Sequence, residues 1–210
     1  MDIKAAIFDL DGTLIDSMAV WDGAWERFCL KYAPVRDEKL FAEYKARTLG
    51  TAIDFYKNAF NIPATADTLA DEVNGYVLEG YRTVEPKAGV REYLNRLASA
   101  GVPACVATNT VRPLVEFVLN RLGLSEYFKF ILTCTEFGSG KDRPDIFYEC
   151  ARRLGSVPEG TAVFEDAPHA LLTAGGAGFL TVAIHDRSYA AAEPQLRLAA
   201  DMYIADFTEI

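Results

Sequence analysis

The sequence has few of the residues that build zinc sites, disulfides or basic surfaces. It contains two histidines and four scattered cysteines in 210 residues, without a Cys-x-x-Cys pair. A zinc site is therefore not expected, and we interpret the cysteines as reduced, mostly buried thiols of a cytoplasmic protein. Acidic residues outnumber basic ones by 30 to 21, and the net charge of −9 argues against binding of nucleic acids or anionic membranes. A small anionic substrate stays compatible with this charge, because a metal ion and one lysine can reverse its sign locally.

Long apolar runs are also absent. No stretch approaches the roughly 18 residues that a membrane span needs, and the first residues predict a strand rather than a signal peptide. Hydrophobic residues make up 50% of the chain, which is enough for a globular core. The length suits one core domain, or a core domain with a small insert.

A short, mainly apolar run near the start of the chain ends abruptly at two acids. Residues 3–8 have the pattern of a strand buried on both faces, and Asp9 and Asp11 follow. Alternate residues of an extended chain point the same way, so both carboxylates should project from the carboxyl end of this strand, where open parallel sheets bind ligands. The two charges repel each other, and a divalent cation that takes oxygen ligands would compensate them. The alternative is an ordinary strand end that turns at Gly12, with two solvated acids.

The rest of the chain divides into a helical block and a segment in which strands and helices alternate. From about residue 18 to residue 82 the apolar spacing is helical, with little sign of a strand. The alternation that follows predicts an α/β fold with a mostly parallel sheet covered by helices on both faces. Its expected strands are 103–107, 130–132, 161–164, 180–184 and an edge strand at 201–204. We predict a core domain formed by residues 1–16 and 86–210, and a helical insert formed by residues 17–85.

Polar side chains follow the second predicted strand. A hydroxyl or amide there, from Thr108 or Asn109, can donate to an anionic oxygen held near the acid pair. Thr108 lies at the strand edge itself, and we interpret it as a functional residue. Thr110 is interpreted as the N-cap of the following helix.

Charged side chains stand on either side of the fourth predicted strand. Lys141 could reach the two carboxylates and a phosphate as a point charge, although a lysine before a helix is most often solvated. Arg143 is assigned to the solvated surface. Glu165 and Asp166 follow the strand, and adjacent acids at that place suggest a shared cation. Capping of the next helix by Asp166 is the alternative.

These segments resemble the four motifs of the haloacid dehalogenase (HAD) superfamily, in the same order and over essentially the whole chain. Residues 9–17, which read DLDGTLIDS, are similar to the first motif. Thr108 is similar to the hydroxyl residue of the second motif, Lys141 to the lysine of the third, and Glu165 and Asp166 to the acids of the fourth. The helical block resembles the C1-type cap of the phosphoglycolate phosphatase and β-phosphoglucomutase branch.

The resemblance implies a fold, a cofactor and a role for each motif residue. The fold would be a Rossmannoid core with the first strand central and a small all-helical cap inserted after it. Asp9 would be the nucleophile that forms an aspartyl-phosphate, and Asp11 the general acid and then the general base. Mg²⁺ would be held by acids at the strand ends: Asp9, the Asp11 carbonyl, Asp166 and, directly or through water, Glu165. The phosphoryl oxygens would be held by three donors: Thr108, Asn109 and Lys141.

The sequence departs from this branch at three positions. The branch commonly has Ser after the fourth-motif acids and Gly three residues later, where this chain has Ala167 and Ala170. Both changes put the local loop geometry in doubt, but neither removes a motif residue. Asp142 stands where the branch commonly has Pro, and an extra acid beside Lys141 could weaken the field of its ammonium group.

The expected activity is hydrolysis of a small phosphate ester by a protein that we take by default as a monomer. Phosphoglycolate, sugar phosphates and nucleoside monophosphates all stay open as substrates. The cap should close to exclude water, and four of its residues are candidates for substrate contact: Trp21, Lys45, Arg47 and Thr48. Trp21 is otherwise a core residue, and the three others are otherwise solvated.

A phosphosugar mutase is the main alternative activity. In β-phosphoglucomutases a His stands five positions after the Asp that corresponds to Asp16, where this chain has Trp21. Because an indole has no basic nitrogen, it cannot relay protons as imidazole does, and a phosphatase is favoured. A response-regulator receiver also uses an aspartyl-phosphate but has no helical insert at this place. A non-catalytic binding protein usually loses a motif residue, and none is lost here.

Overall fold

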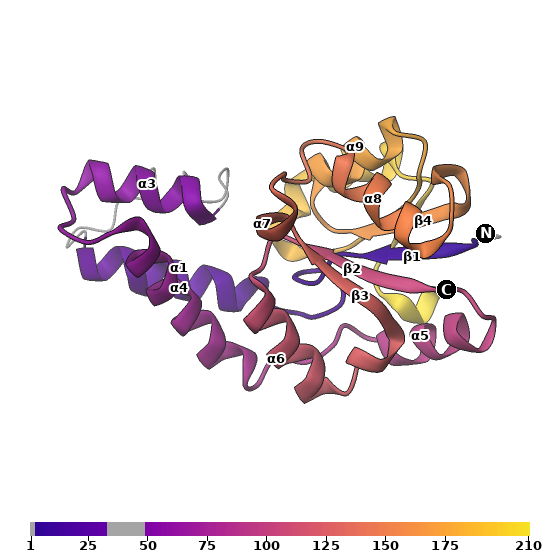
Figure 1. The fold of residues 1–210 in the computed structure, drawn as a ribbon, viewed down its shortest axis with the longest axis horizontal. Coiled ribbons are helices and arrows are strands. Elements are labelled where there is room, and N and C mark those ends of the chain that lie inside the picture. The colour runs from indigo at the N-terminus through magenta and orange to yellow at the C-terminus, as the bar shows by residue number, and fades with distance from the viewer. Residues whose placement is uncertain (1–2, 33–48) are drawn as a thin grey trace. The chain divides into compact units, whose positions relative to one another are not determined.

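The computed structural model describes residues 3–32 and 49–210, which form two compact units (Figure 1). The first, here called the core unit, comprises Met1–Met18 and Val84–Ile210. The second, here called the helical unit, comprises Ala19–Thr83. That the helical unit acts as a cap domain stays a prediction.

A six-stranded parallel sheet forms the centre of the core unit. Its order is β3-β2-β1-β4-β5-β6, and every pair of neighbours is parallel. The strands are β1 (Ala5–Phe8), β2 (Ala104–Thr108), β3 (Phe128–Thr133), β4 (Thr161–Glu165), β5 (Leu180–Ile184) and β6 (Met202–Ile204). The predicted α/β class is confirmed. The strand order reverses between β1 and β4. The carboxyl ends of the strands at such a reversal are the place where open parallel sheets bind ligands.

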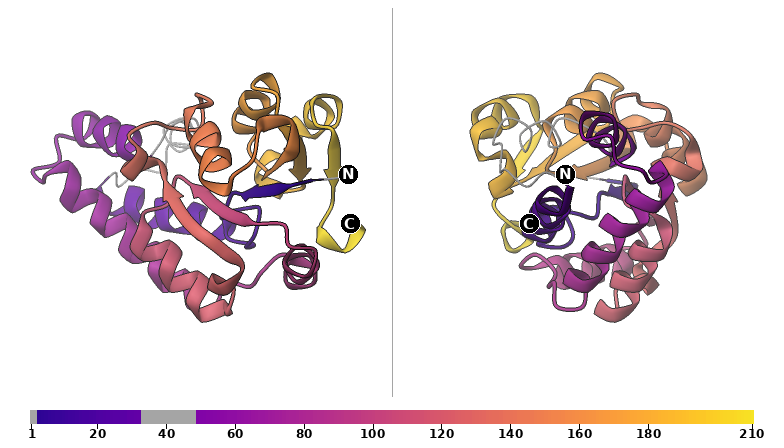
Figure 2. Two further views of the ribbon diagram at one scale, coloured as in Figure 1. Left: turned by 45° about the vertical axis from the view of Figure 1, so that its right-hand side comes forward. Right: turned by 90° about the vertical axis from the view of Figure 1, so that its left-hand side faces the viewer.

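Helices cover both faces of this sheet. Figures 1 and 2 show α8 (Asp145–Leu154) and α9 (Pro168–Gly176) on one face, and α5 (Val90–Ser99) and α6 (Arg112–Leu122) on the other. The chain also forms α7 (Cys134–Phe137) and α10 (Glu193–Ala199), which the apolar pattern did not predict. Both are shorter than the three to four turns over which a helical period becomes visible.

The central strand is held rigidly by burial and aromatic packing. All four residues of β1 are fully buried. The ring of Phe8 stacks on Phe164 of β4 at 4.4 Å and lies 6.2 Å from Phe207, near the C-terminus. Burying a side chain of this size contributes about 1.5–3 kcal/mol. The cluster therefore fixes the position from which Asp9 leaves the sheet.

The helical unit is built around aromatic side chains. Its described helices are α1 (Met18–Tyr32), α3 (Leu49–Ala59) and α4 (Ala66–Tyr81). Phe28 of α1 is fully buried, and its ring lies 5.4 Å from Trp25 and 6.1 Å from Tyr56 of α3. The backbones of α1 and α4 approach closely, because a Cβ added at Gly80 would come 2.3 Å from Val20. In the part of the chain that the structure describes, no helix is both long and apolar enough to span a bilayer.

Candidate active site

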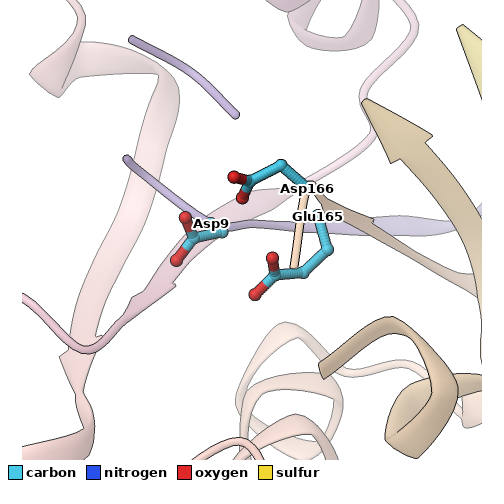
Figure 3. Close-up of side chains that lie close together, drawn as sticks. All are labelled: Asp9, Glu165 and Asp166. Atoms are coloured by element: carbon cyan, nitrogen blue, oxygen red, sulfur yellow. The ribbon is translucent and has the colours of Figure 1, made fainter. Parts of the chain in front are cut away.

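Three buried carboxylates meet where β1 and β4 end. Asp9 follows β1, and its backbone N–H donates to the carbonyl of Phe164 at 3.0 Å. Glu165 is the last residue of β4, and Asp166 follows it. One carboxylate oxygen from each of the three lies within 4.8 Å of the others, and all three residues are buried. Figure 3 shows the three side chains close together. The convergence predicted for these acids is what the parallel pairing of β1 and β4 produces.

Lys141 lies among these acids although it comes from a different segment. It stands in the loop between α7 and α8, and its residue is only 2% exposed. Its Nζ donates to Asp9 Oδ1 and, at 2.7 Å, to Glu165 Oε1. Asp142 is exposed, as is Arg143, which pairs with Asp145 at 2.9 Å. Lys141 therefore contacts one acid of the predicted pair, Asp9, and Glu165 in place of Asp11. The extra acid beside it, Asp142, is exposed.

The electrostatics of the cluster are dominated by burial. Burial raises the pKa of Asp9 to about 8, with Lys141 opposing the rise and the charges of Glu165 and Asp11 adding to it. Burial, followed by repulsion from Glu165 and Asp9, also raises the pKa of Asp166 well above its usual range. Burial alone would lower the pKa of Lys141, but the carboxylates of Asp9 and Glu165 hold it above its ordinary value. If all three acids were ionised, their charges would outnumber that of the one ammonium group, and a bound cation would offset the excess and favour the ionised forms.

One oxygen of Asp166 indicates where such a cation fits. Asp166 Oδ1 accepts a hydrogen bond from Thr13 Oγ1 at 3.2 Å. Asp166 Oδ2 is buried and has no hydrogen-bond partner among the described residues. The loop passes close to it at Gly12, whose φ is 81° and at which a Cβ would come 2.2 Å from this oxygen. A buried carboxylate oxygen without a hydrogen-bond partner costs free energy, which a bound cation would recover. Because Mg²⁺ prefers oxygen ligands, the residues present fit that ion.

Both carboxylate oxygens of Glu165 accept hydrogen bonds from protein groups, whereas only one oxygen of Asp166 does. Its Oε1 accepts from Lys141 Nζ, and its Oε2 accepts from the backbone N–H of Ala167 at 3.0 Å. The Ser-to-Ala departure at position 167 therefore leaves a backbone donor in place for Glu165. Ala170 is fully buried in α9, where a small side chain packs against the sheet.

Asp11 is not one of the three clustered acids, and its carboxylate accepts hydrogen bonds from two hydroxyl groups. Ser17 Oγ donates to Asp11 Oδ1 at 2.6 Å, and Thr110 Oγ1 donates to Asp11 Oδ2 at 2.6 Å. The interpretation of Thr110 as a helix cap is wrong. The N-cap of α6 is Val111, which makes no side-chain capping bond, because the helix begins one residue later than predicted.

The two predicted phosphate ligands after β2 differ in exposure. Thr108 is 1% exposed at the end of β2, and its Oγ1 accepts from the backbone N–H of Thr110 at 3.1 Å. Asn109 is exposed. Their role in holding phosphoryl oxygens stays a prediction.

The candidate substrate residues of the helical unit are not brought to this site by the described structure. Trp21 is half-buried on α1. Lys45, Arg47 and Thr48 lie outside the described residues. Conversely, the sequence predicts a structural role for Thr110, whereas the structure shows its hydroxyl in contact with Asp11. Its spacing of two from Thr108 was the signal, since alternate residues at a strand end point the same way.

Comparisons with known proteins show which family this chain resembles. A family model described as haloacid dehalogenase-like hydrolase matches residues 3–178. The chain is 29% identical to validoxylamine A 7'-phosphate phosphatase of Streptomyces hygroscopicus over 99% of its own length and 95% of that protein. It is 26% identical to a β-phosphoglucomutase of Mycobacterium tuberculosis over 99% of its length and 91% of the relative. A crystal structure of a HAD hydrolase from Entamoeba histolytica shares the fold, with a TM-score of 0.86 at 23% identity, covering 99% of this chain and 95% of the other.

Proposed function

The chain belongs to the haloacid dehalogenase-like hydrolases, and from this premise we propose that it is a Mg²⁺-dependent phosphatase of a small phosphorylated carbohydrate. The reaction is hydrolysis of a phosphate monoester through an aspartyl-phosphate. The observation that carries the proposal is the buried Lys141, which bridges Asp9 and Glu165 beside the orphaned oxygen of Asp166. An ammonium group in that place neutralises charge on a phosphoryl group in transfer, which is most of what this chemistry requires.

The first half of the reaction transfers the phosphoryl group to the protein. A carboxylate oxygen of Asp9 attacks phosphorus while the bond from phosphorus to the ester oxygen breaks. Asp11 gives its proton to the departing alkoxide, so the product leaves as a neutral alcohol. Lys141, with Thr108 and Asn109, holds the phosphoryl oxygens during the transfer.

The second half returns the protein to its starting state. Asp11, now a carboxylate, takes a proton from a water molecule while the oxygen of that water attacks phosphorus. The bond between phosphorus and Asp9 breaks, and inorganic phosphate is released. Asp9, Asp166, Glu165 and the Asp11 carbonyl would hold Mg²⁺, which supplies positive charge that neutralises the phosphoryl oxygens.

The class of substrate is suggested by the relatives. Their names include a hexitol phosphatase and a fructose-1-phosphate phosphatase of Escherichia coli, and a phosphorylated carbohydrates phosphatase of Thermotoga maritima. A mutase is the second candidate, because relatives of that name match most of the chain. Trp21 favours hydrolysis, since no basic nitrogen stands at that position to relay protons to a sugar.

A product analysis with Mg²⁺ tests the proposal. The protein is incubated with a panel of sugar and polyol phosphates, and separately with β-glucose 1-phosphate and a trace of glucose 1,6-bisphosphate. We expect release of inorganic phosphate from at least one ester of the panel. Rapid formation of glucose 6-phosphate with little phosphate release would overturn hydrolysis in favour of the mutase. Asp9→Asn is the control, because it removes the nucleophile and keeps the shape of the side chain.

A further inference from the structure

The carboxylate of Asp11 accepts hydrogen bonds from two hydroxyl groups that belong to different parts of the core unit. Ser17 Oγ and Thr110 Oγ1 each lie 2.6 Å from a different oxygen of Asp11. Ser17 is fully buried and Thr110 is 4% exposed. Ser17 stands just before α1, whereas Thr110 follows β2 and is 99 residues away from Asp11 in the chain. Each of the two carboxylate oxygens of Asp11 therefore accepts a hydrogen bond from a hydroxyl group of a different segment.

The surroundings of Thr110 give its hydroxyl no capping role. The N-cap of α6 is Val111, without a side-chain bond, and the donor of Thr110 goes to Asp11. The backbone N–H of Thr110 is in turn fixed by Thr108 Oγ1 at 3.1 Å. The turn after β2 is therefore built so that a buried hydroxyl faces the side chain that follows β1.

We propose that Thr110, acting with Ser17, is a positioning residue that holds Asp11 for proton transfer to the leaving group. This inference rests on the proposed function. A hydroxyl both donates and accepts, so it can bind Asp11 as a carboxylate and as a carboxylic acid. Because each of the two hydroxyl groups is bonded to a different oxygen of Asp11, together they fix the direction of its side chain. A misplaced acid loses much of its effect, because proton transfer requires a close and aligned approach.

Leaving groups of different basicity distinguish this role from a structural one. The departing p-nitrophenolate of p-nitrophenyl phosphate needs little help from an acid, phenolate needs more, and the alkoxide of glycerol 2-phosphate needs most. The constant kcat/KM includes only the steps up to release of this group, so it isolates the transfer in which Asp11 donates. Thr110→Val removes the hydroxyl and keeps the shape, and Thr110→Ser keeps the hydroxyl.

We expect Thr110→Val to lower kcat/KM by about thirtyfold for glycerol 2-phosphate and by less than about threefold for p-nitrophenyl phosphate, with phenyl phosphate between them. Thr110→Ser should stay within about threefold of the wild type for all three esters. Ser17→Ala should repeat the pattern of Thr110→Val, and it serves as the second variant if Thr110→Val does not fold. Thermal melts show which variants are folded.

Two results overturn the proposal, and they differ in what else they overturn. Equal losses for all three esters, or no loss for glycerol 2-phosphate, in variants of an active wild type would reject the positioning role alone. A wild-type protein that hydrolyses none of the three esters, and no sugar or polyol phosphate of the panel, in the presence of Mg²⁺ would reject the proposed function, and the positioning role with it.

Discussion

The core unit and the helical unit bury different kinds of side chains. Among the described residues, every buried charged side chain lies in the core unit, and those of the site are Asp9, Lys141, Glu165 and Asp166. The described part of the helical unit buries apolar and aromatic side chains such as Trp25 and Phe28. Its described ion pair of Arg27 with Glu79, at 2.6 Å, lies at the surface.

If the buried charges carry out the proposed chemistry, this difference separates the part of the molecule that serves activity from the part that serves stability. Removing charges from water is costly even when they are paired, and surface pairs contribute little in either direction. The aromatic core of the helical unit contributes burial without that cost. Substitutions in the acid cluster should therefore change activity more than stability, and substitutions in the aromatic core should do the reverse.

The largest effect on activity is expected from Asp9→Asn. Loss of the proposed nucleophile should lower kcat by about 10⁴-fold or more with any phosphate ester, because an amide cannot form the covalent intermediate. The melting temperature should change little, since Asn fills the same space at the end of β1. A folded variant that keeps a rate near that of the wild type would contradict the expectation that the acid cluster governs activity.

Lys141→Ala should have the next largest effect. Removing an ammonium group that contacts both Asp9 and Glu165 should cost on the order of a hundredfold in kcat/KM. Lys129→Ala, which removes an exposed lysine of β3, is the matched control and should be neutral. A loss of less than about threefold for Lys141→Ala would return this lysine to a purely structural role.

In the helical unit, Phe28→Ala should affect stability instead. The fully buried ring packs against Trp25, Tyr32 and Tyr56, and its loss should cost about 3–5 kcal/mol of unfolding free energy. Denaturant unfolding measures this cost. At a temperature where the variant is folded, kcat/KM for p-nitrophenyl phosphate should fall by less than about tenfold, because the buried charges of the site are untouched. A larger fall, without loss of stability, would show that this aromatic core serves catalysis.

A smaller effect on stability is expected from pH in metal-free protein. The folded pKa of Asp9 is about 8 and its unfolded value about 3.8, so the folded state binds the proton more tightly. Its contribution to stability is complete below about pH 4 and is lost as the pH rises to about 8. The melting temperature in EDTA should therefore fall between pH 5 and pH 8, and the fall should be smaller in Asp9→Asn.

Mg²⁺ should act in the opposite direction, because it binds the ionised carboxylates and competes with protons. The rise in melting temperature on adding Mg²⁺ should be larger at pH 8 than at pH 5. A metal-free protein that is more stable at pH 8, or a Mg²⁺ effect that is larger at pH 5, would contradict the assigned direction of the Asp9 shift.

Much of the core unit could be predicted from sequence because its signals are local. The apolar run before Asp9 and the strand at 180–184 matched β1 and β5 closely. Strand ends carry their polar residues directly after them, so the sequence also indicated that Asp9, Glu165 and Asp166 converge. The short helices α7 and α10 were missed because they are too brief to show a period.

What the sequence could not predict depends on contacts between distant segments. The hydroxyl of Thr110 faces Asp11 only because β2 pairs with β1 in one particular register, Ala6 opposite Ala104. The exposure of Asp142 likewise follows from the path of the loop before α8, which no local pattern records. From residue type alone, Thr110 is interpreted as a helix cap and Asp142 as an acid that could weaken the field of Lys141.

The aspartyl-phosphate on Asp9 is the central claim, and Asp11→Asn with p-nitrophenyl phosphate tests it most directly. In this variant the good leaving group can still depart, but no base remains to activate water. We predict a rapid burst of one p-nitrophenol per protein molecule in the presence of Mg²⁺, with the phosphoryl group recovered by mass spectrometry on the peptide that contains Asp9. A burst whose phosphoryl group lies on another residue, or steady release of phosphate without a burst, would contradict the account.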